Sequence, residues 1–118
     1  PHRDDNVLRM AARLAALDDA QLDVITVVPD YGMSVVGTYF DKDHHPRIEE
    51  DARQRLHDLV AEVLGHEANE KVRHVVVTGN AYEEILRVAR ADGAALIVLG
   101  PNAARVVRHA DCSVMVVR

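Results

Sequence analysis

Apolar residues recur every three to four positions in four segments of the chain, and this spacing predicts four helices. The segments are residues 5–17, residues 46–64, the stretch between Asn80 and Gly93, and residues 102–110. Asp4 or Asp5 can cap the first helix, Pro46 suits a first helical position, and Gly65 closes the second helix. The third helix has an apolar face formed by Ile85, Leu86, Val88 and Ala89.

Four short runs of β-branched and aliphatic residues predict strands, at residues 22–28, 72–78, 95–99 and 113–117. The first run reads LDVITVV and ends at Pro29. An almost continuous apolar run of this kind is typical of a parallel strand that is covered on both faces.

The stretch from Pro29 to His45 mixes glycines, aspartates and two histidines with several apolar residues. The apolar residues are Met33, Val35, Val36, Tyr39 and Phe40. We expect a long loop with buried anchors, and these side chains either fold over their own domain or form an interface.

Helices and strands alternate strictly along the chain, which indicates an α/β fold with a mainly parallel sheet and helices on both faces. The first helix has no strand before it, although such sheets place their ligands at the carboxyl ends of central strands. Either the domain starts with a helix, or a strand lies upstream of Pro1.

The composition fits one domain that spans residues 1–118, because 48% of the residues are hydrophobic and only 3% are aromatic, so the core is aliphatic. The net charge of -5 argues against a nucleic-acid partner or an anionic membrane surface. The chain has neither an apolar run long enough to span a bilayer nor an N-terminal signal segment, so we expect a cytoplasmic protein.

The residues suggest neither ordinary enzyme catalysis nor a metal site. No Ser-His-Asp ordering, Cys-x-x-Cys pair or recognisable carboxylate dyad occurs. The single cysteine, Cys112, reads as a small residue that enters a buried strand. His44 and His45 are adjacent, so their side chains diverge, and the nearby carboxylates have no known ligand spacing. We expect His109 to have a capping or surface role at the end of the last helix.

Three segments together resemble the universal stress protein family. Residues 99–118 (LGPNAARVVRHADCSVMVVR) are similar to the family's last turn, helix and strand, and residues 78–100 are similar to its glycine-containing turn, helix and aliphatic strand. Residues 23–40 are similar to its second strand and the exit from it. The resemblance implies an open, mainly parallel five-stranded sheet whose first strand lies upstream of Pro1.

The family's nucleotide-binding members carry an acidic residue after the first strand and a G-x-x-G-x9-G-(S/T/N) loop after the fourth, and this sequence has neither intact. Gly100 alone stands where the family has three glycines. The residues before Gly100 match the start of that loop, whereas those after it match its end. Because of this mismatch, we hypothesise that roughly a dozen residues belong between about Val98 and Pro101 in the natural protein. The alternative is a natural variant that lost this loop and does not bind ATP.

The resemblance implies an adenine nucleotide, ATP or AMP with or without Mg²⁺, bound at the carboxyl edge of the sheet. The backbone of Val27, otherwise a core strand residue, would meet the adenine. Gly100 and Asn102 would face phosphate at a helix N-terminus, where Asn102 could equally be a helix cap. Pro101 departs from the family pattern, because proline offers neither an N–H nor a hydroxyl.

We expect the turn of residues 78–80 to lie at the same edge, with Asn80 capping the next helix or taking part in the site. The resemblance also implies a homodimer formed through the strand Ser113 to Val117, whose apolar outer edge needs a partner. It implies a regulator of the stress response with at most slow ATP hydrolysis or self-phosphorylation. The alternative is a member of the same fold that binds no nucleotide and acts as a dimerisation or interaction module.

Overall fold

The computed structural model describes residues 2–29, 37–100 and 104–117, and helices and strands alternate along these ranges. The elements are α1 (His2–Leu17), β1 (Asp23–Val28), α2 (Gly37–Leu64), α3 (His66–Lys71), β2 (Arg73–Thr78), α4 (Ala81–Asp92), β3 (Leu96–Leu99), α5 (Ala104–His109) and β4 (Ser113–Val116). The predicted α/β class is confirmed, and all four predicted strands form within one residue of their expected ends.

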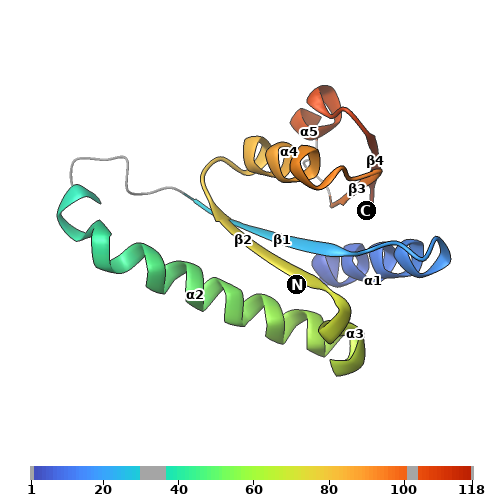
Figure 1. Cartoon of the computed structure of the whole chain (residues 1–118), viewed down its shortest axis with the longest axis horizontal. Coiled ribbons are helices and arrows are strands. Elements are labelled where there is room, and N and C mark those ends of the chain that lie inside the picture. The colour runs from blue at the N-terminus through green and yellow to red at the C-terminus, as the bar shows by residue number, and fades with distance from the viewer. Residues whose placement is uncertain (1, 30–36, 101–103, 118) are drawn as a thin grey trace.

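The strands pair in parallel, as predicted, but the described residues form two separate two-stranded sheets. β1 pairs with β2 in a register that runs from Asp23↔Arg73 to Val28↔Thr78. β3 pairs with β4 from Leu96↔Ser113 to Leu99↔Val116. β1 and β3 are not hydrogen-bonded to each other, so one edge of each has no neighbouring strand in the described structure (Figure 1).

Two contacts show that the two sheets run in the same sense. At one end, the Arg73 guanidinium at the start of β2 binds Asp92, the last residue of α4, shortly before β3 begins. At the other end, Gly100 follows β3 and lies beside Val7, in the first half of the helix that leads back to the start of β1. The amino ends of β1 and β3 therefore share one side of the molecule, and their carboxyl ends share the other.

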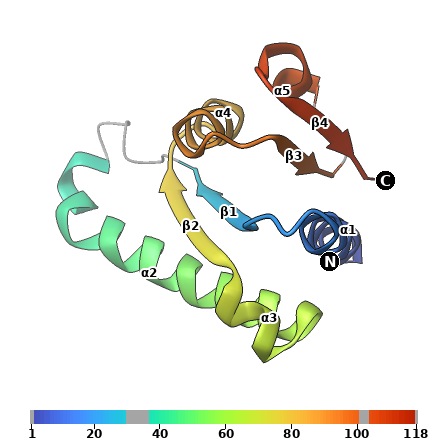
Figure 2. The same cartoon turned by 45° about the vertical axis from the view of Figure 1, so that its right-hand side comes forward.

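The helices lie on both sides of the strands. In both views α4 and α5 lie above the strands, and α2 and α3 lie below them (Figure 1, Figure 2).

The buried core is divided into two clusters, as the strands are divided into two sheets. One buried cluster joins α1, α2 and the residue before β2, and consists of Leu8, Leu56, Val60 and Val72. The other joins α4, β3 and α5, and consists of Leu86, Ile97 and Val106.

α2 corrects the predicted loop of residues 29–45, because the helix begins at Gly37 rather than at Pro46. Residues 30–36 lie outside the described ranges, so the expectation for that part of the loop stays a prediction. Pro46 favours a helix start because it has no N–H to donate, but a helix that is already anchored by packing can extend past one missing hydrogen bond. Of the apolar residues on α2, Leu56 and Val60 are buried, whereas Ile48 is exposed.

The short helix α3 follows Gly65 directly and has no counterpart in the predicted elements. Gly65 has a φ of 94°, a conformation that favours glycine and lets the chain turn out of α2. α4 has the expected signals at both ends. The Asn80 side chain accepts a hydrogen bond from the Glu83 N–H at 3.4 Å, and Gly93 closes the helix at a φ of 64°.

β1 is less covered than its apolar sequence predicts. Only Val28 is buried, and residues 23–27 are half-buried. The radius of gyration is 15.0 Å, compared with about 13.5 Å for a compact domain of this length. β1 has a neighbouring strand on one side only, which leaves its other edge uncovered in the described structure.

Candidate functional site

The strand order changes direction between β1 and β3, and this junction is the place where a parallel α/β sheet binds ligands. From β1 the chain proceeds to β2 on one side, whereas β3 is followed by β4 on the other side. The connections therefore diverge, and the carboxyl ends of β1 and β3 meet with no crossing connection between them. This geometry marks the ends of β1 and β3 as the candidate site.

Alternating backbone groups decide which residues of β1 face this junction. The carbonyl oxygens of Leu22 and Val28 accept hydrogen bonds from the N–H groups of Arg73 and Gly79 on the β2 side, at 3.1 and 2.9 Å. Peptide groups alternate between the two edges of a strand, so the even-numbered residues of β1 face β2. The N–H and C=O groups of Val27, like those of residues 23 and 25, point toward the β3 side.

The same reasoning places the free backbone groups of β3. The Leu99 carbonyl accepts a hydrogen bond from the Val117 N–H at 2.7 Å, so residues 97 and 99 face β4. Leu96 and Val98 therefore turn their peptide groups toward β1. Val27 and Gly100, two of the four sequence-predicted site residues, lie on the two sides of the junction at its carboxyl end. Pro101 and Asn102 lie outside the described residues, as does part of the stretch in which we hypothesised missing residues.

The turn from β2 into α4 forms the outer part of the same edge. The Thr78 hydroxyl donates a 2.8 Å hydrogen bond to the Glu49 carboxylate on α2. Gly79 has a φ of 149°, and a Cβ at this position would lie 3.1 Å from Cγ of Glu84. The capping role expected for Asn80 is confirmed. These contacts hold the turn in place through local structure, and its side chains are engaged within the chain.

A cavity of about 530 Å³ lies between the two sheets, along β1 and β3. Its apolar walls come from β1, β3, α4 and one residue of α1, and include Ala11, Leu22, Ile25, Ile85, Val88 and Val98. Asp23, Arg73 and Asp92 line its polar end. We call this cavity the inter-sheet slot.

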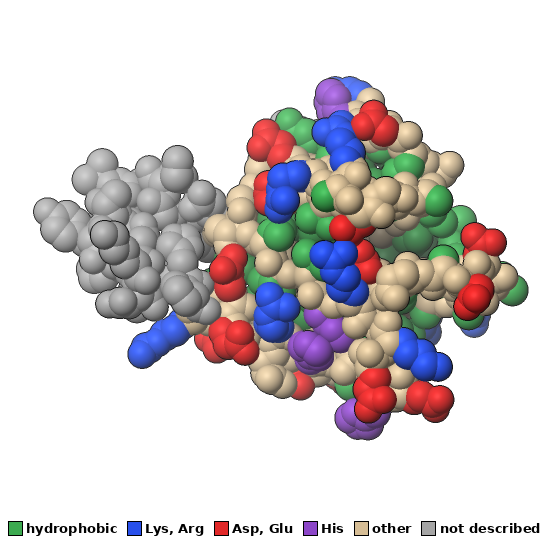
Figure 3. All heavy atoms as spheres, viewed as in Figure 1, with side chains coloured by type: hydrophobic (Ala, Val, Ile, Leu, Met, Phe, Trp, Pro, Cys, Tyr) green, Lys and Arg blue, Asp and Glu red, His purple; other side chains and the backbone are tan. Residues whose placement is uncertain are grey.

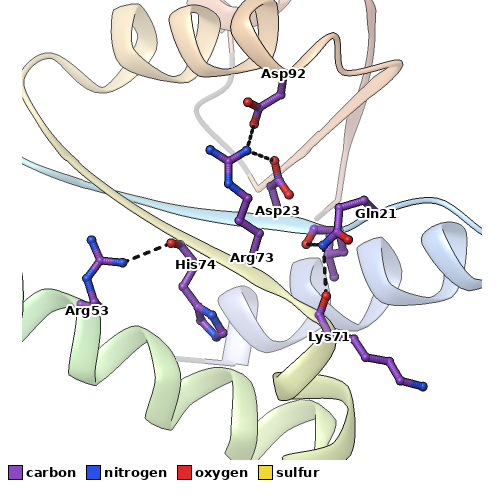
Figure 4. A network of polar contacts seen from close by, with 8 residues as sticks. Gln21, Asp23, Arg53, Lys71, Arg73, His74 and Asp92 are labelled. Atoms are coloured by element: carbon purple, nitrogen blue, oxygen red, sulfur yellow. Dashed lines mark hydrogen bonds and ion pairs between the residues drawn. The ribbon is translucent and has the colours of Figure 1, made fainter.

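Arg73 holds two carboxylates together at the polar end of the inter-sheet slot (Figure 4). Its Nη1 lies 3.2 Å from Asp23 Oδ2 and 2.9 Å from Asp92 Oδ2. Burial and the hydrogen bond with Asp92 raise the pKa of Asp23, and the hydrogen bond from Asp23 lowers the pKa of Asp92. Asp23 Oδ1 is buried and has no hydrogen-bond partner. The sequence does not predict this group. The one indication in it is a charged residue at the start of each of two apolar strands, Asp23 in β1 and Arg73 in β2.

A histidine pair lies on the other side of β2, between that strand and α2. The rings of His57 and His74 stack with centroids 3.5 Å apart. His74 Nε2 donates to the Asn69 side-chain oxygen at 2.6 Å. Arg53 donates to the His74 carbonyl at 3.3 Å (Figure 4). Burial, together with the nearby His57 and Arg53, lowers the pKa of His74. The sequence does not predict this pair either, because two histidines 17 residues apart form no pattern that indicates a contact.

The remaining candidates of the sequence reading are spread over the molecule. His109 is exposed at the end of α5, and its carbonyl accepts a hydrogen bond from Arg90, which fits the expected surface role. Cys112 is half-buried and packs against the second core cluster. His44 and His45 have no described side chains. In the ranges that the structure describes, no group of three or more His, Cys, Asp and Glu side chains could hold a metal ion.

Charged side chains of both signs are mixed on the face shown in Figure 3, with apolar side chains between them. No helix of the described chain is both long enough and apolar enough to cross a membrane.

The chain is similar to known proteins along its whole length. The model of the universal stress protein family matches residues 1–118. The solved structure of the hypothetical protein MJ0577, which was used for a structure-based assignment of biochemical function, has a TM-score of 0.79 and 19% sequence identity, and the match covers 98% of this chain and 87% of that one. A universal stress protein family member from Burkholderia pseudomallei has a TM-score of 0.58 and 24% identity, with 99% and 88% covered. At these identities, the structural likeness shows a shared fold.

Proposed function

The chain belongs to the universal stress protein family, and from this premise we propose that it binds an adenine nucleotide, ATP or AMP, and acts as a dimeric, cytoplasmic regulator of the stress response. The observation that carries the proposal is the position of Val27. Its backbone N–H and C=O point away from β2, at the carboxyl end of the strand where the strand order changes direction.

These backbone groups fit the edge of an adenine ring, which offers a donor and acceptors side by side. Gly100 lies across the junction and has no side chain to keep a ligand from its backbone, as phosphate recognition requires. Pro101 and Asn102 would follow at the phosphate end, where Asn102 offers an amide and Pro101 offers no N–H. Mg²⁺ would accompany the phosphates of ATP as their counterion.

Calorimetric titration with ATP and with AMP tests the proposal, and GTP serves as the control for base recognition. We expect heat of binding with both adenine nucleotides, a higher melting temperature at millimolar nucleotide, and a weaker response to GTP. The absence of both heat and thermal stabilisation with ATP and AMP would overturn nucleotide binding.

The β4 edge favours a second candidate function, an interaction module that works through dimerisation. Residues 114 and 116 turn their peptide groups away from β3, and Val116 is 40% exposed. An apolar strand edge of this kind binds a second strand. Light scattering on the wild type and on Val116→Pro tests this pairing, since proline removes an outward N–H. A dimer that becomes monomeric in Val116→Pro, in a chain that binds no nucleotide, would favour the module; a variant that stays dimeric would exclude this edge.

A further inference from the structure

Two histidine side chains meet where α2 packs on β2, on the face of the strand opposite to Arg73. The rings of His57 and His74 stack with their centroids 3.5 Å apart and their planes inclined by 21°, and both residues are half-buried. Leu56, the neighbour of His57 on α2, belongs to the first core cluster, as does Val72 at the start of the strand segment. The histidine pair therefore lies at the margin of the apolar contact that holds α2 in place.

The groups that surround the pair do not stabilise a proton on it. The Asn69 side chain from α3 is uncharged and contacts His74 Nε2 at 2.6 Å. The Arg53 guanidinium from α2 is a cation and donates to the His74 carbonyl at 3.3 Å. β1 places the apolar Val24 opposite His74 in the sheet. In the described part of the chain, neither imidazole forms an ion pair with a carboxylate.

The carboxylates of the neighbouring elements are engaged elsewhere or exposed. On α2, the carboxylates of Glu49 and Asp58 accept hydrogen bonds from other side chains. On β1, Asp23 binds Arg73 on the other face of the sheet. The remaining described charged side chains of α2 and α3 are exposed to solvent, and they are Arg47, Glu50, Asp51, Arg55, Glu62, His66, Glu67, Glu70 and Lys71.

A proton on the pair therefore has a cost that exists only while α2 is packed on β2. An imidazolium in the stack would lie against a second titratable ring and would lose part of its hydration. Burial, with the charges of His57 and Arg53, accordingly lowers the pKa of His74. When α2 separates from β2, the His74 ring reaches water and regains its ordinary affinity for a proton. Protons bind the separated state more strongly, so they favour it as the pH falls below about 6.5.

We propose that the His57–His74 stack is a proton-operated latch, which holds the carboxyl half of α2 on β2 at neutral pH and releases it in acid. Release uncovers the apolar side chains of Leu56, Val60 and Val72. The second core cluster, on α4, β3 and α5, shares no residue with the first and stays closed. The latch is independent of nucleotide binding. One proton taken up on release changes the ratio of released to packed helix by up to about tenfold between pH 7.5 and 5.5.

Hydrogen exchange at pH 7.5 and 5.5, corrected for the intrinsic exchange rate at each pH, tests the latch. A helix without its packing partner is only marginally stable in water, so its amides lose protection on release. We expect the protection of the Leu56 and Val60 amides to fall at least threefold at pH 5.5, and that of Leu86 and Ile97 in the second core cluster to change less than twofold. Unchanged protection at Val60, or an equal loss in both clusters, would overturn the latch.

Matched variants assign the effect to the pair. His74→Gln cannot take up a proton in this pH range, whereas His66→Gln removes an exposed histidine from α3. We expect His74→Gln to abolish the pH dependence of exchange at Val60, and His66→Gln to keep it as in the wild type. A pH dependence that survives in His74→Gln, or disappears in His66→Gln, would show that another group operates the release.

A nuclear magnetic resonance titration tests the coupling of the two rings without altering His74. His57→Phe keeps a flat ring beside His74 but cannot carry a charge, so the pKa of His74 should rise toward its ordinary value. The same pKa in the wild type and in His57→Phe would mean that the two rings do not repel each other when protonated, and the proposed latch would be wrong.

Discussion

The assignment of β1 backbone groups to opposite edges can be tested by proline substitutions at two neighbouring positions. The Thr26 N–H faces β2, and the Val27 N–H faces the junction with β3. Both residues are half-buried in the same strand. Thr26→Pro and Val27→Pro therefore impose a similar restriction on φ, but they remove N–H groups that have different partners.

The difference between the two variants follows from the loss of one ladder hydrogen bond. Thr26→Pro removes that bond and leaves a carbonyl on β2 without its donor, which costs about 1–3 kcal/mol. The proline ring would also project into β2. Val27→Pro removes an N–H from the edge at which, in the described part of the chain, no strand lies to accept it. Thr26→Ala and Val27→Ala provide the corrections for the lost side chains.

Urea unfolding followed by circular dichroism measures the four free energies of unfolding. After the alanine corrections, we expect Thr26→Pro to be less stable than Val27→Pro by at least about 1 kcal/mol. Calorimetry with ATP completes the test, because Val27→Pro should bind ATP at least several-fold more weakly, whereas Val27→Ala should bind it like the wild type. Equal corrected costs would refute the edge assignment, and unchanged ATP binding by Val27→Pro would refute the adenine contact.

Three further predictions concern stability. Val60 is completely buried, so Val60→Ala should cost about 2–3 kcal/mol in urea unfolding, from two lost methyl groups and the cavity they leave, whereas Val107→Ala at a 52% exposed position should cost less than about 0.5 kcal/mol. Asn80→Ala should cost about 1 kcal/mol through the lost helix cap, and Asn80→Asp should restore most of it; equal losses in both would exclude capping as the cause. The pKa of His74 is lowered in the folded chain, so the unfolded chain binds the proton first and stability should fall as the pH drops below about 6.5. His74→Gln should make the free energy of unfolding less dependent on pH between 7.5 and 5.5, and an unchanged slope would remove His74 as its source.

The elements that follow from local signals were predictable from the sequence. The spacing of apolar residues predicts α4. Asn80 caps its amino end and Gly93 closes its carboxyl end, as the sequence predicts. The strands followed from runs of β-branched residues. The start of α2 was not predictable, because Gly37 is a poor helix former and Pro46, which lies inside the helix, has no N–H to donate to the preceding turn.

The candidate site was predictable only in outline. The alternation of helices and strands placed a ligand at a carboxyl edge, and the family resemblance singled out Val27. Which backbone groups of β1 are free depends on its register with β2, and no local pattern encodes that register. The Asp23, Arg73 and Asp92 group is likewise a product of tertiary structure, since its members come from β1, β2 and α4.

The unpaired edges of β1 and β3 bear on the proposed nucleotide site. The nucleotide contacts lie on opposite sides of the junction, with Val27 on one sheet and Gly100 beyond the other, so nucleotide affinity depends on how firmly the two sheets are held together. The two core clusters are separate, and between β1 and β3 no ladder fixes that distance in the described structure.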